Sequence, residues 1–384
     1  MEAATGQLPW DGPEAFPEKP DDGAEYGYVL SDSHHGCSRE ILEERSAEVN
    51  AWGSPTVVRV WTPESPYLVL PEEVPWLHDA VRKRNRRTGL RGLIWSVVFL
   101  LVFSPLLLFA DSKLFRIFLV FYYLPIFVSA AASVRAMFKS PSLKPEEVRR
   151  EAEASRYEAW VVTRPITYTK WLCGFVVAAG VCQAAGLENS INAAGLVKDA
   201  VWRGQWWRLF TCSMLHVSFM HFWMNFLALR GLGRLVEAHA SRWHLPVVFL
   251  VSVLTGSLAS LLLLPSTTSA GASGGLMGLI GFLGAAGYRH REHLPRSFLR
   301  GILLNVLFVG LIGVVGFDFI DNAAHAGGLL GGAATGLVLV RGRAGAYGSE
   351  PPRWLRRAGV AALSLLLLVT ATTIWAILKT TIRP

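Results

Sequence analysis

Long apolar blocks separated by short polar connections make up most of the chain after residue 90. Each block is close to the roughly 20 residues that an α-helix needs to cross the hydrocarbon core of a bilayer. We therefore predict membrane-spanning helices at residues 93–110, 114–134, 171–187, 213–232, 245–264, 274–288, 301–317, 322–340 and 358–378. This pattern predicts an all-α protein, a polytopic membrane helix bundle that carries a helical hairpin near its amino terminus.

The first 90 residues have a different character. They are polar, contain Pro and Gly throughout, and show little helical periodicity, although residues 56–70 alternate enough to predict short strands. We expect the following organisation: a polar, partly disordered cytoplasmic region at 1–90, a transmembrane hairpin at 91–135, a basic cytoplasmic linker helix at 136–165, a membrane domain at 166–378 and a short tail at 379–384.

Composition supports the membrane assignment. The chain is 52% hydrophobic and only 17% charged, whereas soluble domains carry about 25% charged residues. The net charge is +8, yet residues 1–50 are acidic, so the basic residues are concentrated in the loops. The loops Arg234 to Arg242, Arg289 to Arg300 and Arg341 to Arg357 fall on one side of the predicted bundle. Cytoplasmic loops are enriched in Lys and Arg, so we interpret this charge as an orientation signal rather than as a nucleic-acid surface.

The same rule places the amino terminus in the cytoplasm, because the basic run from Arg82 to Arg87 precedes the first span. We expect an integral, multi-pass protein of a bacterial cytoplasmic membrane. Its four cysteines are scattered without paired spacing, which predicts neither a disulfide framework nor a metal site. We interpret the cluster from His34 to Cys37 as part of a solvated tail, and we expect no cofactor.

Polar side chains inside membrane spans are costly and usually mark function. Ser273 begins one apolar block, His325 lies near the start of another, and His221 and Asn225 are four residues apart in a third. With a rise of 1.5 Å per residue, all of them fall in the outer half of the bilayer. A serine, a histidine and an amide in one layer predict acyl transfer, with a nucleophile, a base and oxyanion donors.

Glycine spacing gives a reason for these groups to meet. Ser273 alone could be a small packing residue, but it lies at a helix amino terminus, which favours a developing anion. Gly274 and Gly278 leave one flank of its helix bare, and His325 shares a face with a second stripe, Gly328, Gly332 and Gly336. Two bare flanks allow close helix contact, which predicts a Ser273–His325 dyad.

Two further residues have alternative interpretations. His216 lies about 140° around the predicted helix from His221, so we interpret it as a structural hydrogen-bonding residue. Asp321 could orient the His325 imidazole as a triad acid does, but it also precedes the span at the usual place of a helix N-cap. We favour the N-cap.

These motifs resemble those of the rhomboid intramembrane serine proteases. The resemblance covers residues 166–378, and several separated motifs occur in the family's order. They comprise Trp207 and Arg208, then His216, His221 and Asn225, then Gly233 and Glu237, then Gly271, Ala272, Ser273 and Gly274, and finally Ala324, His325, Gly328 and Gly332.

The resemblance implies a six-helix core with a seventh helix after it, and a Ser273–His325 dyad that needs no acid. It implies that His221, Asn225 and the backbone N–H of Ser273 donate hydrogen bonds to the oxyanion. Substrates would be membrane-spanning protein helices, cut in a hydrated site near the outer surface. The fifth core helix and the loop 318–321 would gate their entry.

Two positions depart from the resemblance. Met277 stands where some members have an aromatic residue, and Gln205 stands where some have an acid. The alternative to a protease is a non-catalytic rhomboid-like adaptor that binds transmembrane helices. A small-solute transporter is a third possibility, but it would place charged or broken helices at the midplane. The sequence specifies neither the substrate nor the oligomeric state.

Overall fold

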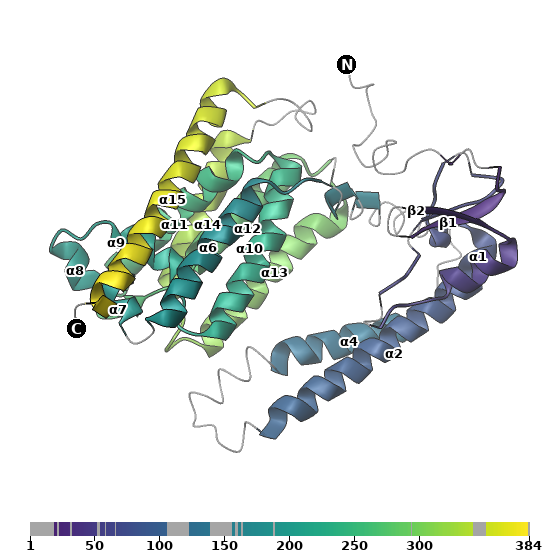
Figure 1. Ribbon diagram of the computed structural model, residues 1–384, viewed down its shortest axis with the longest axis horizontal. Helices are drawn as coiled ribbons and strands as arrows, with labels where there is room; N and C mark the ends of the chain where they lie inside the picture. Colours follow the sequence, from purple (N-terminus) through teal and green to yellow (C-terminus); the bar gives the residue numbers. More distant parts are fainter. Residues whose placement is uncertain are drawn as a thin grey trace. The chain divides into compact units, whose positions relative to one another are not determined.

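The computed structural model describes residues 19–20, 23–30, 33–51, 54–57, 59–65, 67–105, 123–138, 156–157, 160–162, 164–186, 189–292, 294–340 and 351–382. The chain divides into two compact units, residues 1–160 and residues 161–384, and each is described by itself (Figure 1).

The first unit contains a small antiparallel sheet. Strand β1 (Tyr26–Leu30) pairs on one side with β2 (Ser33–Cys37) and on the other with β3 (Arg59–Trp61). Strand β3 lies in the segment whose alternation predicts strands, whereas β1 and β2 were not predicted. Helix α1 (Arg39–Ser46) follows β2, begins at the N-cap Ser38, and contributes Leu42 to a buried apolar cluster.

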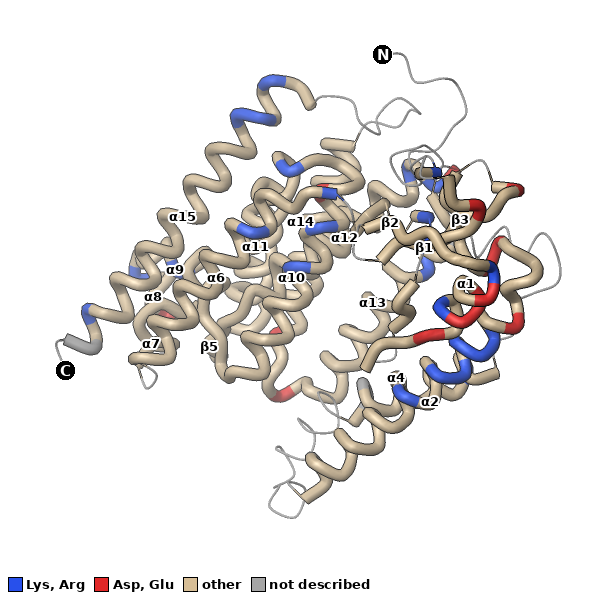
Figure 2. The backbone as a smooth tube through the Cα atoms, turned by 45° about the vertical axis from the view of Figure 1, so that its right-hand side comes forward, with Lys and Arg blue, Asp and Glu red and all other residues tan. Residues whose placement is uncertain are grey.

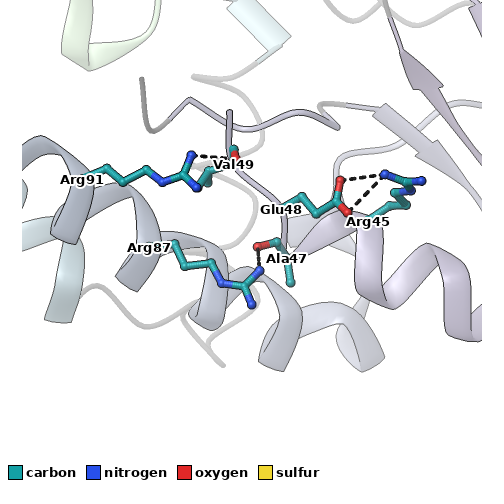
Figure 3. A network of polar contacts seen from close by, with 6 residues as sticks. All are labelled: Arg45, Ala47, Glu48, Val49, Arg87 and Arg91. Carbon is teal, nitrogen blue, oxygen red and sulfur yellow. Dashed lines mark hydrogen bonds and ion pairs between the residues drawn. The ribbon is translucent and has the colours of Figure 1, made fainter. Parts of the chain in front are cut away.

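Helix α2 (His78–Phe103) begins earlier than expected, so the proposed boundary at residue 90 falls inside it. Its basic first half packs on the sheet region. Arg84 is buried and forms an ion pair with the partly exposed Glu72. Arg87 and Arg91 donate hydrogen bonds to the carbonyl oxygens of Ala47 and Val49 at 2.9 and 3.0 Å (Figure 3).

These contacts account for part of the basic run that we used as an orientation signal, so the cytoplasmic position of the amino terminus stays a prediction. The second helix of the hairpin, α4 (Leu124–Phe138), packs along α2. Residues 106–122 of the hairpin, and residues 139–155 of the predicted linker helix, lie outside the described residues.

The second unit is a helix bundle, and its apolar helices carry few charges along their length (Figure 2). The longer helices are α6 (Tyr168–Ala185), α10 (Phe219–His239), α11 (His244–Leu263), α12 (Ser273–Arg289), α13 (Arg296–Val315), α14 (Asn322–Leu339) and α15 (Arg353–Ile382). Each of the predicted spans from residue 171 onward overlaps one of them, and all except the span at 213–232 agree with the observed bounds to within a few residues. Shorter elements occupy the loop between α6 and α10, namely α7 (Ser190–Ala194), β4 (Leu196–Val197), α8 (Lys198–Trp202), α9 (Arg208–Thr211) and the 3₁₀ turn η5 (Cys212–Met214).

The predicted span at 213–232 differs from the observed helix. Helix α10 begins at Phe219, because the side chain of Ser218 accepts a hydrogen bond from the N–H of His221 and caps the helix there. The segment Arg208–Met214 meets α10 at an angle of 95°. Within the described residues, α11, α13 and α15 are each long and apolar enough to cross a bilayer, and the bent pair passes the same test as a unit.

Helices α12, α14 and α11 form the centre of the bundle. Helices α12 and α14 run in the same direction, with glycines of α14 against carbonyl groups of α12. A Cβ atom added to Gly328 would lie 2.0 Å from the carbonyl oxygen of Gly274. A Cβ atom added to Gly332 would lie 1.9 Å from the carbonyl oxygen of Gly278. At the other end, Arg289 donates hydrogen bonds to the carbonyl oxygens of Leu337 and Val340. The two backbones are therefore in contact along their length.

Candidate active site

Ser273 is the first residue of α12, so its backbone lies in the ring of N–H groups at the helix start. The preceding turn depends on Gly271, whose φ of +145° is strained for any residue with a side chain. The N–H of Gly271 donates to the carbonyl oxygen of Cys212 at 2.9 Å, which holds the turn against the loop that precedes α10. The Ser273 side chain is partly exposed.

His325 lies in the first turn of α14, and Asp321 caps that turn. The Asp321 carboxylate accepts a hydrogen bond from the N–H of Ala324 at 2.8 Å, and its carbonyl oxygen accepts one from the N–H of His325 at 3.1 Å. Among the described residues no hydrogen bond joins the carboxylate to the His325 ring. The geometry is that of an N-cap.

The residues beside Ser273 and His325 are in direct contact. The carbonyl oxygen of Ala324 lies 3.4 Å from the position of a Cβ atom on Gly274 and 2.7 Å from that of one on Gly256. At Gly256 a side chain would clash with α14, whereas at Gly274 a methyl group would be in ordinary contact with it. The starts of α12 and α14 are thereby fixed next to each other.

The His221 ring lies against the same turn. A Cβ atom on Gly271 would lie 2.7 Å from Cε1 and 3.1 Å from Nε2 of His221, and 3.6 Å from Oγ of Ser273. The Nδ1 atom of His221 is buried and has no hydrogen-bond partner in the described part of the chain. No hydrogen bond joins the Ser273 hydroxyl to either histidine ring in this structure. Such bonds often form only when substrate is bound.

Asn225 is buried one turn below His221, and its amide donates to the carbonyl oxygen of His221 at 2.7 Å. His216 does not lie on this helix, in contrast to our interpretation of it at 140° from His221. It belongs to the segment before Phe219, and its ring packs edge-on against that of His221, with 5.2 Å between the centroids.

Gln183 of α6 holds the backbone of His216 through two hydrogen bonds, accepting from its N–H at 2.9 Å and donating to its carbonyl oxygen at 2.7 Å. Sequence analysis missed this residue, although a buried amide within an apolar span is a usable signal.

Trp207 and Arg208 anchor the loop beside the site. Arg208 is buried, and its guanidinium donates to Gln205 and to the carbonyl oxygens of Gly195 and Asn192 at 2.7, 2.8 and 3.0 Å. It also lies 4.8 Å from the ring centroid of Trp207. Gln205, which stands where some family members have an acid, thus gives Arg208 a neutral hydrogen-bond acceptor.

A cavity of about 40 Å³ adjoins Ser273. The cavity is lined by apolar residues, glycines and a set of polar side chains that come from several elements. The polar side chains are those of Cys212, Ser213, Ser257, Ser269, Ser273 and Asp321. A water molecule needs roughly 10–15 Å³ by the same measure. The cavity is therefore large enough for water next to the serine. Met277 is buried one turn further along α12.

Three polar residues near this cavity were also missed by sequence analysis. Lys198 at the start of α8 is 2% exposed and donates to the hydroxyl of Ser269 at 2.7 Å. Ser260 of α11 and Ser269 both donate to the carboxylate of Asp321. The only signal in the sequence is a lysine within a largely apolar loop, because the serines resemble ordinary small packing residues.

The fold and the site define a class, that of polytopic helical membrane proteins with polar groups gathered at one end of the bundle. Residues 203–342 match the family model of the rhomboid domain. The chain is 37% identical over 167 residues to the rhomboid protease GluP of Bacillus subtilis (strain 168), an alignment that covers 42% of this chain and 30% of that protein.

Two proteins of Arabidopsis thaliana are also similar. RHOMBOID-like protein 4 is 30% identical over 181 residues, which cover 45% of this chain and 46% of the relative. RHOMBOID-like protein 5 is 32% identical over 151 residues, which cover 38% and 48%. The chain spans less than half the length of each of these relatives. It carries a rhomboid domain at residues 203–342, and over that part it is similar to proteins of the rhomboid family.

Proposed function

We propose that this protein is an intramembrane serine endopeptidase that cleaves membrane-spanning protein helices near the outer membrane face. The observation that carries the proposal is the contact between the first turns of α12 and α14, where Gly274 meets the carbonyl group of Ala324. That contact brings the neighbours of these residues, Ser273 and His325, to the same end of the bundle, beside the ring of His221.

In this proposal His325 accepts the proton of the Ser273 hydroxyl as the oxygen attacks the scissile carbonyl carbon. The tetrahedral intermediate collapses to an acyl-enzyme, and His325 gives its proton to the leaving amine. Water, deprotonated by His325, then hydrolyses the ester and restores the serine. The cavity beside Ser273 supports this step, since it is large enough for water in a region otherwise surrounded by apolar helices.

We assign the oxyanion site to His221, Asn225 and the backbone N–H of Ser273. The close approach of the His221 Nε2 atom to Gly271 supports this assignment, as does the position of Ser273 at a helix start. Hydrogen-bond donors fixed at the place where charge develops are usually the largest single contribution to such catalysis.

The remaining residues of the motif act as supports in this proposal. His216 packs against the His221 ring, Trp207 and Arg208 hold the outer loop, and Gly328 and Gly332 keep α14 against α12. We assign no cofactor or metal to the reaction.

The substrate class follows from the surroundings. Helix α13 is only 22% buried, the least of the helices that qualify as spans, and its carboxyl-terminal end is joined to the start of α14 by a hydrogen bond from Asn322 to the carbonyl oxygen of Gly313. A weakly packed helix beside the site suits lateral entry of a substrate helix from the lipid. We propose that the site faces the exterior of a bacterial cytoplasmic membrane, with the amino terminus inside.

The proposal is tested by labelling the purified full-length protein with a fluorophosphonate probe, which reacts with activated serines. We expect the wild type to be labelled, and Ser273→Ala and His325→Ala to lose at least about 10³-fold of the labelling rate. Ser257→Ala is the matched control, since Ser257 lines the same cavity and should be dispensable.

Cleavage of a model transmembrane substrate in liposomes, read by mass spectrometry of the products, places the cut relative to the membrane. A wild type that neither labels nor cleaves while still binding transmembrane helices would support the adaptor alternative instead. Equal labelling of wild type and Ser273→Ala would refute the dyad.

A further inference from the structure

A second polar cluster adjoins the site and contains one positive and one negative side chain. The ammonium group of Lys198 donates to the hydroxyls of Ser269 and Thr267 at 2.7 and 3.3 Å. The Ser269 hydroxyl in turn donates to the carboxylate of Asp321, which also accepts from Ser260. Ser269 therefore bridges the two charges.

This pair is placed where an unbalanced charge would be costly. Lys198 is 2% exposed, and Ser260 is fully buried. Burial lowers the pKa of the Lys198 amine, while the nearby carboxylate of Asp321 opposes that shift. Asp321 is only partly buried, so its removal is the costlier change, because it leaves the buried ammonium group of Lys198 uncompensated.

The cluster connects the starts of both helices that carry the site. Ser269 lies four residues before Ser273, and Asp321 lies four residues before His325. Ser269 belongs to β5 (Thr268–Ser269), which pairs with β4 immediately before Lys198. Ser269 and Asp321 also line the cavity that adjoins Ser273.

We propose that Lys198 is a positioning residue for the Ser273–His325 pair, acting across Ser269 on Asp321. Its ammonium group neutralises the carboxylate that caps the His325 helix, and the bridge holds the two helix starts at a fixed separation. The inference rests on the proposed function, because it assigns Lys198 a role in the reaction of that site.

The charge balance has a consequence for the imidazole of His325. Other ionisable groups on its side of the bundle are His221 from α10, with His216 behind it, and the exposed Asp318 in the preceding loop. Helices α11, α12 and α13 carry their ionisable residues near their opposite ends, at His244, Tyr288, Arg289, Arg296 and Arg300. Asp321 and Lys198 are thus the full charges expected to dominate at His325.

The test is the pH profile of fluorophosphonate labelling, measured on full-length protein for Lys198→Met, Asp321→Asn and the double variant. Lys198→Met leaves Asp321 unbalanced and favours the protonated imidazole, so the midpoint of the acid limb should rise by roughly 0.5 to 1 pH unit. Asp321→Asn keeps an efficient N-cap but leaves the lysine unbalanced, so the midpoint should fall by a similar amount. The double variant should return close to the wild-type midpoint.

Lys170→Met removes an exposed lysine from α6 and is the control, with no shift expected. If Lys198→Met does not fold, Ser269→Ala decides, because loss of the bridge should raise the midpoint while Ser269→Thr should restore it. Unshifted midpoints in all variants, or equal losses of rate without a shift, would overturn the role of Lys198. A wild type that does not label at all would instead refute the proposed function.

Discussion

Replacing Gly328 by alanine tests whether the contact between α12 and α14 sets the geometry of the site. A methyl group at this position would lie 2.0 Å from the carbonyl oxygen of Gly274, whereas ordinary contact begins at 3.4 Å, so the backbones would have to separate by about 1.4 Å. Neither backbone carries a flexible side chain at this point that could move aside.

The separation acts directly on the reacting groups, since Gly274 follows Ser273 and Gly328 is three residues after His325. A misplacement of about 1 Å can reduce the rate of an enzyme by roughly 10²-fold. We expect Gly328→Ala to lower kcat for a model transmembrane substrate by at least about 10²-fold. Overpacking should also destabilise the fold by about 1–3 kcal/mol, measured as a lower Tm in detergent.

Two controls separate this effect from the general effect of a methyl group. Gly274→Ala lies on the other side of the same interface, but its methyl group would be 3.4 Å from the carbonyl oxygen of Ala324, which is ordinary contact. Gly174→Ala in α6 would meet no atom within 4 Å. Both should keep most of the activity. Wild-type kcat in Gly328→Ala, or an equal loss in Gly274→Ala, would show that the helix contact does not control the site.

Three further predictions concern charge and protonation. Gln205→Glu should raise the Tm by an amount equivalent to about 1 kcal/mol, because the described residues give the buried Arg208 only neutral acceptors; an unchanged Tm would contradict this. Activity should fall at acidic pH, since protonated His325 cannot accept a proton, and a flat profile to about pH 5 would argue against it as the base. Burial raises the pKa of the Cys37 thiol, so at pH 8 its thiolate fraction is reduced and maleimide should label it more slowly in the folded protein than in denaturant; equal rates would refute the shift.

The sequence was sufficient for the helices of the bundle because their signal is local. The length of each apolar block and the charge of the loops around it predict a span without reference to any other segment. The observed bounds of α11, at His244–Leu263, differ by one residue from the prediction. The polar residues of the site were visible for the same reason, since Ser273, His325 and Asn225 stand out against apolar neighbours.

Local signals failed where another part of the chain determines the conformation. The prediction of a helix at 213–232 could not show that Gln183 of α6 holds the backbone of His216, so His216 was assigned to the wrong element. The sheet of the first unit was missed at β1 and β2, although Gly27 has a clear role there: a Cβ atom on it would lie 2.1 Å from the ring of Trp61. The need for glycine at this position arises only when β1 pairs with β3, which carries Trp61.

By itself the sequence determined a membrane helix bundle and the set of groups available for chemistry, since both depend on which residues are apolar and how they are spaced. The tertiary structure alone decided which of these groups are neighbours. It placed α12 and α14 in parallel contact through Gly328 and Gly332, and it connected Lys198 to Asp321 across Ser269. Contacts of this kind join residues far apart in the chain, and their energy depends on packing and burial, which have no counterpart in the local pattern.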